Sequence, residues 1–261
     1  MTCSAVAYFF AEQVTEVLDI PVGLVISSWG GSRIESWMNE KTLASIDGVD
    51  IEAARSSKLK MHHRLGCMYD TMLWPVRNFT ARGFLWYQGE SNIFNYYCYA
   101  PMMTAMVQLW REVWEAPNMP FYYVQIAPHK YKDSQDTDAA LLREAQIKAL
   151  EIIPNSGMVS TADIGDEFCI HPPQKDVVGL RLATLALTKT YNICGLPSTG
   201  PTMTKVNYSE GKAIVTFDNA SAGLTPAFCN LKGFEIAGAD KKFYPAQAQI
   251  IDRTPTVRVW S

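Results

Sequence analysis

At positions 84 to 92 the chain reads FLWYQGESN, an apolar run that ends in polar residues grouped around one glycine. The run Phe84–Gln88 has the length and composition of a buried strand. Similar runs occur at Pro21–Ser27 (PVGLVIS), Phe121–Ala127 (FYYVQIA) and Met158–Ala162 (MVSTA). We therefore expect these segments to be strands of one parallel sheet.

Helical patterns lie before, between and after these runs. Apolar residues recur at helical spacing within Ser4–Asp19, and Ser4 could cap the start of that helix. Further helices are expected at roughly 100–114, 138–153 and 174–192. The alternation of strands and helices predicts an α/β fold, with a parallel sheet covered by helices on both faces.

The pattern changes near Gly195–Pro201 (GLPSTGP), a stretch rich in proline and glycine. Short β-like runs follow it at Lys212–Phe217, Phe234–Ile236 and Thr256–Trp260. The sequence therefore predicts two domains, an α/β domain over residues 1–197 and a partial, all-β accessory domain over residues 198–261.

Composition excludes several classes of function. The 261 residues are 48% hydrophobic and carry a net charge of −3, so nucleic acid and anionic membranes are not expected partners. No apolar run is long enough to span a membrane, which takes about 18 residues. The six cysteines form no C-x-x-C pair and H-E-x-x-H is absent, so no metal site is expected. Most cysteines are expected to be buried as small apolar residues.

Two polar segments directly follow predicted strands. Ser27–Trp37 (SSWGGSRIESW) contains Gly30 and Gly31, which would let the backbone approach a ligand closely. Gln88–Asn92 lies at the carboxyl end of its strand, where ligands bind in open α/β sheets. The alternatives are an ordinary strand-to-helix turn for the first segment and a helix-capping turn for the second.

A third polar segment, Asp163–Lys175 (DIGDEFCIHPPQK), places His171 near Asp163 and Asp166. A histidine at a helix N-terminus is biased towards the neutral form that a general base requires. A carboxylate accepting its other N–H would fix the tautomer. The alternative is a surface histidine with carboxylates that cap the helix. His129, after another strand, is a further candidate for the same crevice.

These three segments, in this order, resemble the sialate O-acetylesterase family of SGNH-type carbohydrate esterases. LREAQ and GFEIAGADKKFYPA also look like family segments, so the resemblance covers essentially the whole chain. It implies an SGNH-like three-layer α/β/α sandwich that removes O-acetyl groups from sialic acid or related sugars. The implied partner is an O-acetylated sugar or glycan, and no metal or organic cofactor is implied.

The resemblance also implies roles for individual residues. His171 takes the role of the base, and Asp166 or Asp163 would orient it. The position three residues before the histidine, acidic in many SGNH enzymes, is Phe168 here. The groups implied to bind the oxyanion or the substrate are Gly30, Gly31, Gln88, Gly89, Glu90 and Asn92.

The family nucleophile lies in a G-Q-S-N motif after the first strand, and this sequence has no G-Q-S-N, G-D-S or G-x-S-x-G. Because the chain also opens on a predicted helix, we expect the first strand and its serine to be missing. One alternative is an inactive carbohydrate-binding fragment or pseudo-enzyme with a crevice lined by Trp29, Trp86 and Tyr87. Another is a substitute nucleophile, Ser28 or Ser91, held against His171.

Overall fold

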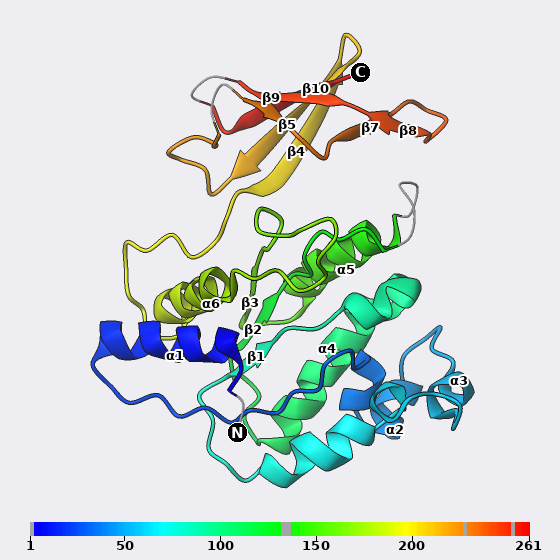
Figure 1. The fold of residues 1–261 in the computed structure, drawn as a ribbon, viewed down its shortest axis with the longest axis vertical. Helices are drawn as coiled ribbons and strands as arrows, with labels where there is room; N and C mark the ends of the chain where they lie inside the picture. Colours follow the sequence, from blue (N-terminus) through cyan, green and yellow to red (C-terminus); the bar gives the residue numbers. More distant parts are fainter. Residues whose placement is uncertain (1–2, 132–136, 227–228, 252–253) are drawn as a thin grey trace. The chain divides into compact units, whose positions relative to one another are not determined.

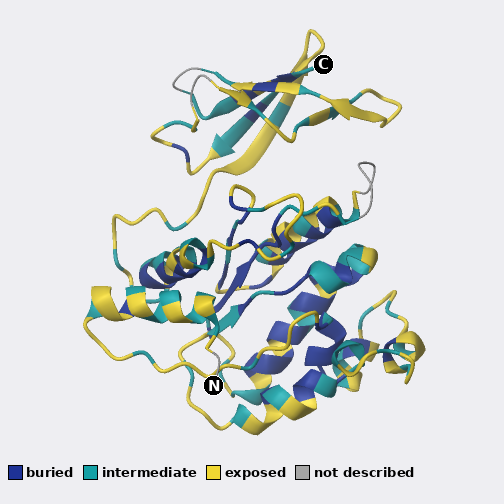
Figure 2. Cartoon of the chain, in the orientation of Figure 1, coloured by how far each residue is buried: buried dark blue, intermediate teal, exposed yellow. Residues whose placement is uncertain are grey.

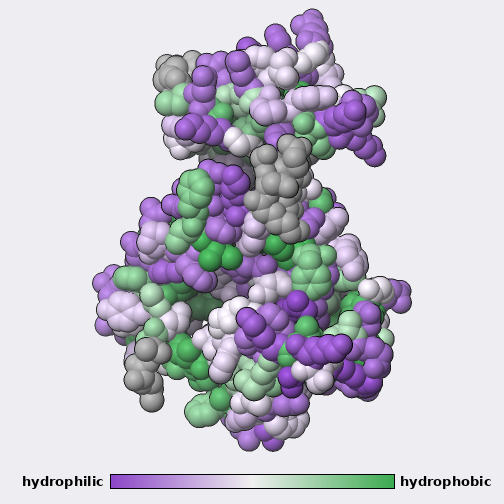
Figure 3. All heavy atoms as spheres, turned by 45° about the vertical axis from the view of Figure 1, so that its right-hand side comes forward, coloured by the Kyte–Doolittle hydropathy of each residue, from purple (hydrophilic) through white to green (hydrophobic). Residues whose placement is uncertain are grey.

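A computed structural model of the chain describes residues 3–131, 137–226, 229–251 and 254–261 (Figure 1). The chain divides into two compact units, Met1–Ser198 and Thr199–Ser261. None of the described helices is long and apolar enough to cross a membrane. On the face that Figure 3 shows, hydrophilic and hydrophobic side chains are interspersed over the larger unit.

The larger unit is built around a parallel sheet of three strands in the order β1-β2-β3. The strands are β1 (Phe84–Trp86), β2 (Phe121–Val124) and β3 (Ser156–Val159). Leu85 lies opposite Tyr122 in the register. The mixed α/β class predicted from the alternating pattern is confirmed, and three of the predicted strands form.

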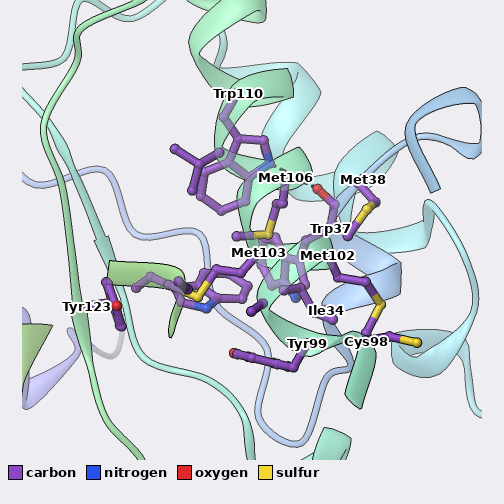
Figure 4. Close-up of a cluster of buried hydrophobic side chains, with 14 of the residues drawn as sticks. Ile34, Trp37, Met38, Cys98, Tyr99, Met102, Met103, Met106, Trp110 and Tyr123 are labelled. Atoms are coloured by element: carbon purple, nitrogen blue, oxygen red, sulfur yellow. Dashed lines mark hydrogen bonds between the residues drawn. The ribbon is translucent and has the colours of Figure 1, made fainter. Parts of the chain in front are cut away.

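One face of the sheet packs against α4 (Tyr96–Val113) and α5 (Asp138–Ile152). Phe121 and Tyr123 of β2 point to this side, because successive side chains of a strand alternate between faces. Both side chains are fully buried. Figure 4 shows the centre of this layer, where Trp110 of α4 lies among methionines and aromatic rings.

The opposite face packs against α6 (Lys175–Lys189), which in turn packs against α1 (Ala5–Leu18). Tyr122 of β2 points to this side. Gly179 lets the two helix backbones approach closely, since a Cβ there would lie 2.8 Å from the carbonyl oxygen of Val6. In Figure 2 the sheet-facing sides of α4 and α6 are dark blue, whereas α1 alternates between yellow and teal, with Val14 as its buried residue.

The first helix begins as predicted. Ser4 is its N-cap, and its hydroxyl accepts a hydrogen bond from the backbone N–H of Ala7. The shorter helices of the larger unit are η1 (Ile34–Trp37), α2 (Glu40–Ala44), α3 (Ile51–Arg55), η2 (Met61–His63), η3 (Tyr69–Leu73), η4 (Trp74–Val76) and η5 (Glu90–Asn95).

The strand predicted at Pro21–Ser27 is wrong. The segment pairs with no described strand, and Leu24, Val25 and Ile26 are 36%, 52% and 41% exposed. An apolar run becomes a strand only where a neighbouring strand satisfies its backbone N–H and C=O groups. Local composition does not supply that neighbour.

Trp86 and the cysteines also depart from expectation. Trp86 is 6% exposed and packs edge-on against Trp37 and Trp110, so it belongs to the core rather than to a sugar crevice. Cys98, on α4, is buried as expected. Most of the other cysteines are exposed, because they lie in loops and turns outside the cores: Cys3, Cys169, Cys194 and Cys229.

The smaller unit is β-rich, as the sequence predicts. Its antiparallel sheet has the strand order β4-β5-β10-β9-β6, and β7 and β8 form a separate pair. Val215, Val257 and Val259 form the centre of its core. The strands are β4 (Thr202–Ser209), β5 (Lys212–Asp218), β6 (Asn230–Leu231), β7 (Glu235–Ala237), β8 (Phe243–Pro245), β9 (Gln247–Ile250) and β10 (Thr256–Trp260).

Candidate active site

Asn92 joins the first two polar segments and is completely buried. Its Oδ1 accepts hydrogen bonds from the backbone N–H of Ile34 at 3.0 Å and from Gln88 Nε2 at 2.8 Å. Its Nδ2 donates to Glu35 Oε2 at 2.8 Å and to Asn95 Oδ1 at 3.1 Å. The side-chain amide of Asn92 is therefore fully used within the protein, and it holds η1 against η5.

Gln88 continues this network at the end of β1. Its Nε2 also donates to the carbonyl oxygen of Ser32 at 2.8 Å, and its Oε1 accepts from the hydroxyl of Tyr99 at 2.9 Å. Gln146 Nε2 donates to the Gln88 carbonyl oxygen at 3.3 Å. The side chains of Gln88 and Asn92 are thus placed to position the two loops and have no polar atom left to donate to a ligand.

Gly89 lies where the strand turns into η5 and cannot carry a side chain. A Cβ there would lie 2.6 Å from Ile126 Cγ2 and 3.0 Å from Leu142 Cδ2. The carbonyl oxygen of Gly89 accepts from the backbone N–H of Asn92 at 2.8 Å. The glycine is required because the turn packs directly against the end of β2 and against α5.

Gly30 and Gly31 form an exposed turn beside this network. The carbonyl oxygen of Gly31 accepts from Ser91 Oγ at 2.8 Å and from His63 Nε2 at 2.9 Å. Within the described part of the chain, the backbone N–H groups of Gly30 and Gly31 have no acceptor. Neither N–H group is therefore paired within the described protein, and a ligand role for the glycine pair stays a prediction.

Glu90 and His171 come from different loops and lie within electrostatic reach of each other. Burial raises the pKa of the Glu90 carboxyl, and the nearby His171 and Lys175 lower it in part. Lys175, at the start of α6, lies with its Nζ 5.2 Å from the centre of the Tyr87 ring. Burial raises the pKa of Tyr87 to about 12. A half-buried carboxyl and an exposed imidazole therefore lie within electrostatic reach of each other.

The two candidate orienting carboxylates differ in their surroundings. Asp163 forms a double hydrogen bond with Arg181, at 2.7 and 2.6 Å, which holds the pKa of Asp163 below its ordinary value. Asp166 Oδ1 accepts from the backbone N–H groups of Phe168 and Cys169 at 2.7 and 3.0 Å. Neither carboxylate is hydrogen-bonded to His171, and no other described residue bonds the imidazole ring.

The two serines considered as substitute nucleophiles form no described hydrogen bond with the His171 ring. Ser91 donates its hydroxyl to the Gly31 carbonyl oxygen. Within the residues that the structure describes, neither Ser28 nor Ser91 is hydrogen-bonded to the His171 ring. The geometry therefore gives no support to a serine of these loops acting as nucleophile.

Tyr131 and two polar residues near it, His129 and Arg143, received no firm role from the sequence. The hydroxyl of Tyr131 and Nδ1 of His129 are buried and make no hydrogen bond with a described residue. Tyr131 lies within electrostatic reach of Glu90 and Arg143, and burial lowers the pKa of Arg143. The segment LREAQ contains Arg143, so its resemblance to a family segment was the available signal.

No group of three or more described His, Cys, Asp or Glu side chains is arranged to hold a metal ion. Glu90 lies within electrostatic reach of His171 and Lys175, and the Gly30–Gly31 turn is joined to the loop of Glu90 by the hydrogen bond from Ser91 Oγ to the Gly31 carbonyl oxygen. These groups can move a proton and bind an anion.

Comparison with solved structures identifies a similar protein. A carbohydrate acetylesterase from Xanthomonas citri is 34% identical, with a TM-score of 0.82, and the match covers 98% of this chain and 57% of that chain.

Curated proteins give a consistent result. Sialate O-acetylesterases from Homo sapiens and Pongo abelii are 28% identical over 229 residues, which cover 81% of this chain and 44% of those proteins. The sialate O-acetylesterase from Mus musculus is 27% identical, over 82% of this chain and 48% of that protein. The chain thus spans about half the length of the curated relatives it matches.

The family comparison covers the polar segments described above. Residues 3–188 match the family described as carbohydrate esterase, sialic acid-specific acetylesterase. This range includes the glycine turn, the Gln88–Asn92 segment and His171. The chain belongs to this carbohydrate esterase family.

Proposed function

We propose that this chain is the α/β part of a carbohydrate O-acetylesterase that removes O-acetyl groups from sialic acid or related acetylated sugars. The observation that carries the proposal is that hydrogen bonds from Ser91 to Gly31 and from Gln88 to Ser32 hold the glycine turn against the loop of Glu90, inside the matched family range that also contains His171. The names of the similar proteins support the substrate class.

The proposed reaction is acyl transfer through a serine, with His171 as the base. The serine hydroxyl attacks the acetyl carbonyl carbon, and His171 accepts its proton. The tetrahedral intermediate collapses, the C–O bond to the sugar breaks, and His171 returns the proton to the sugar oxygen. Water then attacks the acetyl-enzyme by the same route and releases acetate. The nucleophile is proposed to be the serine of a G-Q-S-N motif, which these 261 residues do not contain.

The remaining groups receive separate roles. The backbone N–H groups of Gly30 and Gly31 are proposed to bind the oxyanion, because they are exposed and without a described acceptor. Gln88, Gly89 and Asn92 are proposed to position the loops and not to touch the substrate. The side-chain amides of Gln88 and Asn92 are already hydrogen-bonded within the protein, and Gly89 packs so closely against Ile126 that it leaves no room for another group.

Two carboxyl groups are proposed to act on His171. Glu90 acts on His171 through its charge when it is ionised, because the two groups lie within electrostatic reach of each other. Asp166 is preferred over Asp163 for orienting the ring. The Asp163 carboxylate is already paired with the Arg181 guanidinium. Asp166 Oδ2, in contrast, makes no hydrogen bond with a described residue.

For the fold, we propose an SGNH-like three-layer α/β/α sandwich over residues 1–197. Helices on both faces of the parallel sheet and the likeness to the Xanthomonas citri esterase support it. Residues 198–261 are proposed to be a partial accessory domain.

The second candidate function is carbohydrate binding without catalysis. Trp29 favours it, since its ring is 46% exposed and stacks on His62 at 6.1 Å. Burial of Trp86 removes one of the three aromatic residues that this alternative used.

Turnover of O-acetylated sialic acid distinguishes the two functions. We expect a form extended with a G-Q-S-N segment to release acetate at enzymatic rates. The 261-residue chain alone should be far slower, within the residual 10³–10⁴ or so over water that triad-deleted hydrolases retain. Equal and negligible turnover by both forms, with sugar binding intact, would favour the binding function.

A further inference from the structure

Arg33 carries a guanidinium group that the described structure leaves without a hydrogen-bonding partner. Its Nε is buried and makes no hydrogen bond, and no described carboxylate forms an ion pair with this side chain. A buried donor left unpaired costs free energy, so an unpaired group in a native protein calls for an explanation. A ligand that accepts from Arg33 would provide one.

The Arg33 side chain is held in place despite its lack of polar partners. Its guanidinium carbon lies 4.5 Å from the centre of the Phe94 ring, which is 50% exposed. Its backbone N–H donates to the carbonyl oxygen of His62, and its carbonyl oxygen accepts from Ser36 Oγ at 2.6 Å. The planar fork is therefore anchored at its base and on one face, which lowers the entropy cost of binding an anion.

Arg33 lies beside the candidate active site. Its two neighbours along the chain, Ser32 and Ile34, are bonded to Gln88 and Asn92 respectively. Its aromatic partner, Phe94, belongs to η5, the same short helix that begins with Glu90. A sugar whose acetyl group reached the Gly30–Gly31 turn would therefore have Arg33 within the same pair of loops.

The charges around Arg33 favour an anion. Burial is the first cause of the lowered pKa of His63, and Arg33, Lys60 and His62 lower it further through their positive charge. Glu35, the nearest acidic residue in the sequence, is buried and turned to Asn92 and Asn95. Arg33 and Lys60 thus both place positive charge near His63, and no described carboxylate forms an ion pair with Arg33.

We propose that Arg33, stacked on Phe94, binds the carboxylate of an acidic sugar and makes the site selective for acetylated sugar acids over neutral acetylated sugars. The guanidinium fork matches a carboxylate with two parallel hydrogen bonds. Trp29, 46% exposed on the same loop, offers an apolar surface beside it. The inference deepens the proposed function and rests on it for the role of the bound sugar.

The test compares two probes that differ only in the carboxylate, N-acetylneuraminate and its methyl ester. We expect calorimetry to show that the 261-residue chain binds the acid about tenfold more tightly than the ester. Arg33→Gln should remove this difference. Arg82→Gln is the matched control, because Arg82 also stacks on an aromatic ring, Tyr191, at 5.6 Å, and it should keep the preference.

A second variant separates recognition from stability. Arg33→Lys keeps the charge but loses the planar fork, so it should retain only part of the preference. Equal affinity for both probes, binding of neither at millimolar concentration, or an undiminished preference in Arg33→Gln would overturn the proposal. The binding measurement needs no turnover, so an extended chain that fails to release acetate would contradict the proposed function without affecting this result.

Discussion

The Asn92 side chain donates to the Glu35 carboxylate at 2.8 Å, across 57 positions of sequence. This buried contact ties the glycine-containing segment to the segment after β1. Both segments look like exposed polar turns in the sequence, yet the residues that fix their relative position are buried. The loops of the candidate active site are therefore held by a buried hydrogen-bond network. The contribution of that network to the free energy of unfolding can be measured separately from activity.

Replacing Asn92 should destabilise the larger unit strongly. Asn92→Ala leaves the Ile34 N–H, Gln88 Nε2 and the Glu35 carboxylate without their partner, at a cost of about 3 kcal/mol. Urea unfolding measures this cost. Asn118→Ala, at an exposed position, should change the free energy of unfolding by less than about 0.5 kcal/mol. Similar values for the two variants would show that the network does not hold the loops.

Replacement by alanine should destabilise the protein at Gly89 but not at Gly30. Gly89→Ala brings a methyl group to 2.6 Å from Ile126 Cγ2, so we expect a loss of about 2 kcal/mol in the free energy of unfolding. Gly30→Ala meets no atom within 4 Å and should be tolerated. Thermal melts of the two variants test the packing of the turn. A Gly89→Ala variant as stable as the parent would contradict it.

The contribution of Glu90 to the free energy of unfolding should depend on pH. Burial raises its folded-state pKa above the ordinary value of 4.5, so its stabilising contribution is complete below pH 4.5 and is lost as the pH rises through the folded pKa. Glu90→Gln should therefore be more stable than the parent at neutral pH and equal to it at low pH.

The same substitution should slow ester hydrolysis, because the imidazolium of His171 loses a nearby negative charge. Urea midpoints at several pH values and turnover by a G-Q-S-N-extended form measure the two effects. A variant that is less stable than the parent at neutral pH would contradict the desolvated placement of Glu90.

Much of the fold could be predicted from local pattern. The strands at β1, β2 and β3 and the capped helix α1 follow from apolar periodicity and from Ser4, since these are properties of short segments. Pro21–Ser27 could not be judged in this way. Its apolar composition suits a strand, but pairing depends on a neighbour that local sequence does not specify.

For the site, the sequence identified the segments better than the roles of their members. Glu90 and His171 follow different strands, and that such loops meet at one sheet edge stays a prediction from the parallel sheet. The burial of Gln88 and Asn92 could not be foreseen, because polar residues in a turn usually face solvent. The pairing of Asp163 with Arg181 could not be foreseen either, because Arg181 lies on a helix 18 positions away.

The most direct test of the central claim is the turnover of O-acetylated sialic acid by His171→Ala in a G-Q-S-N-extended form. Loss of the base should lower turnover by about 10³-fold or more, with the fold intact by circular dichroism. Phe168→Ala, in the same loop and 81% exposed, is the control and should retain parental turnover. Unchanged turnover in His171→Ala would contradict the assignment of His171 as the base.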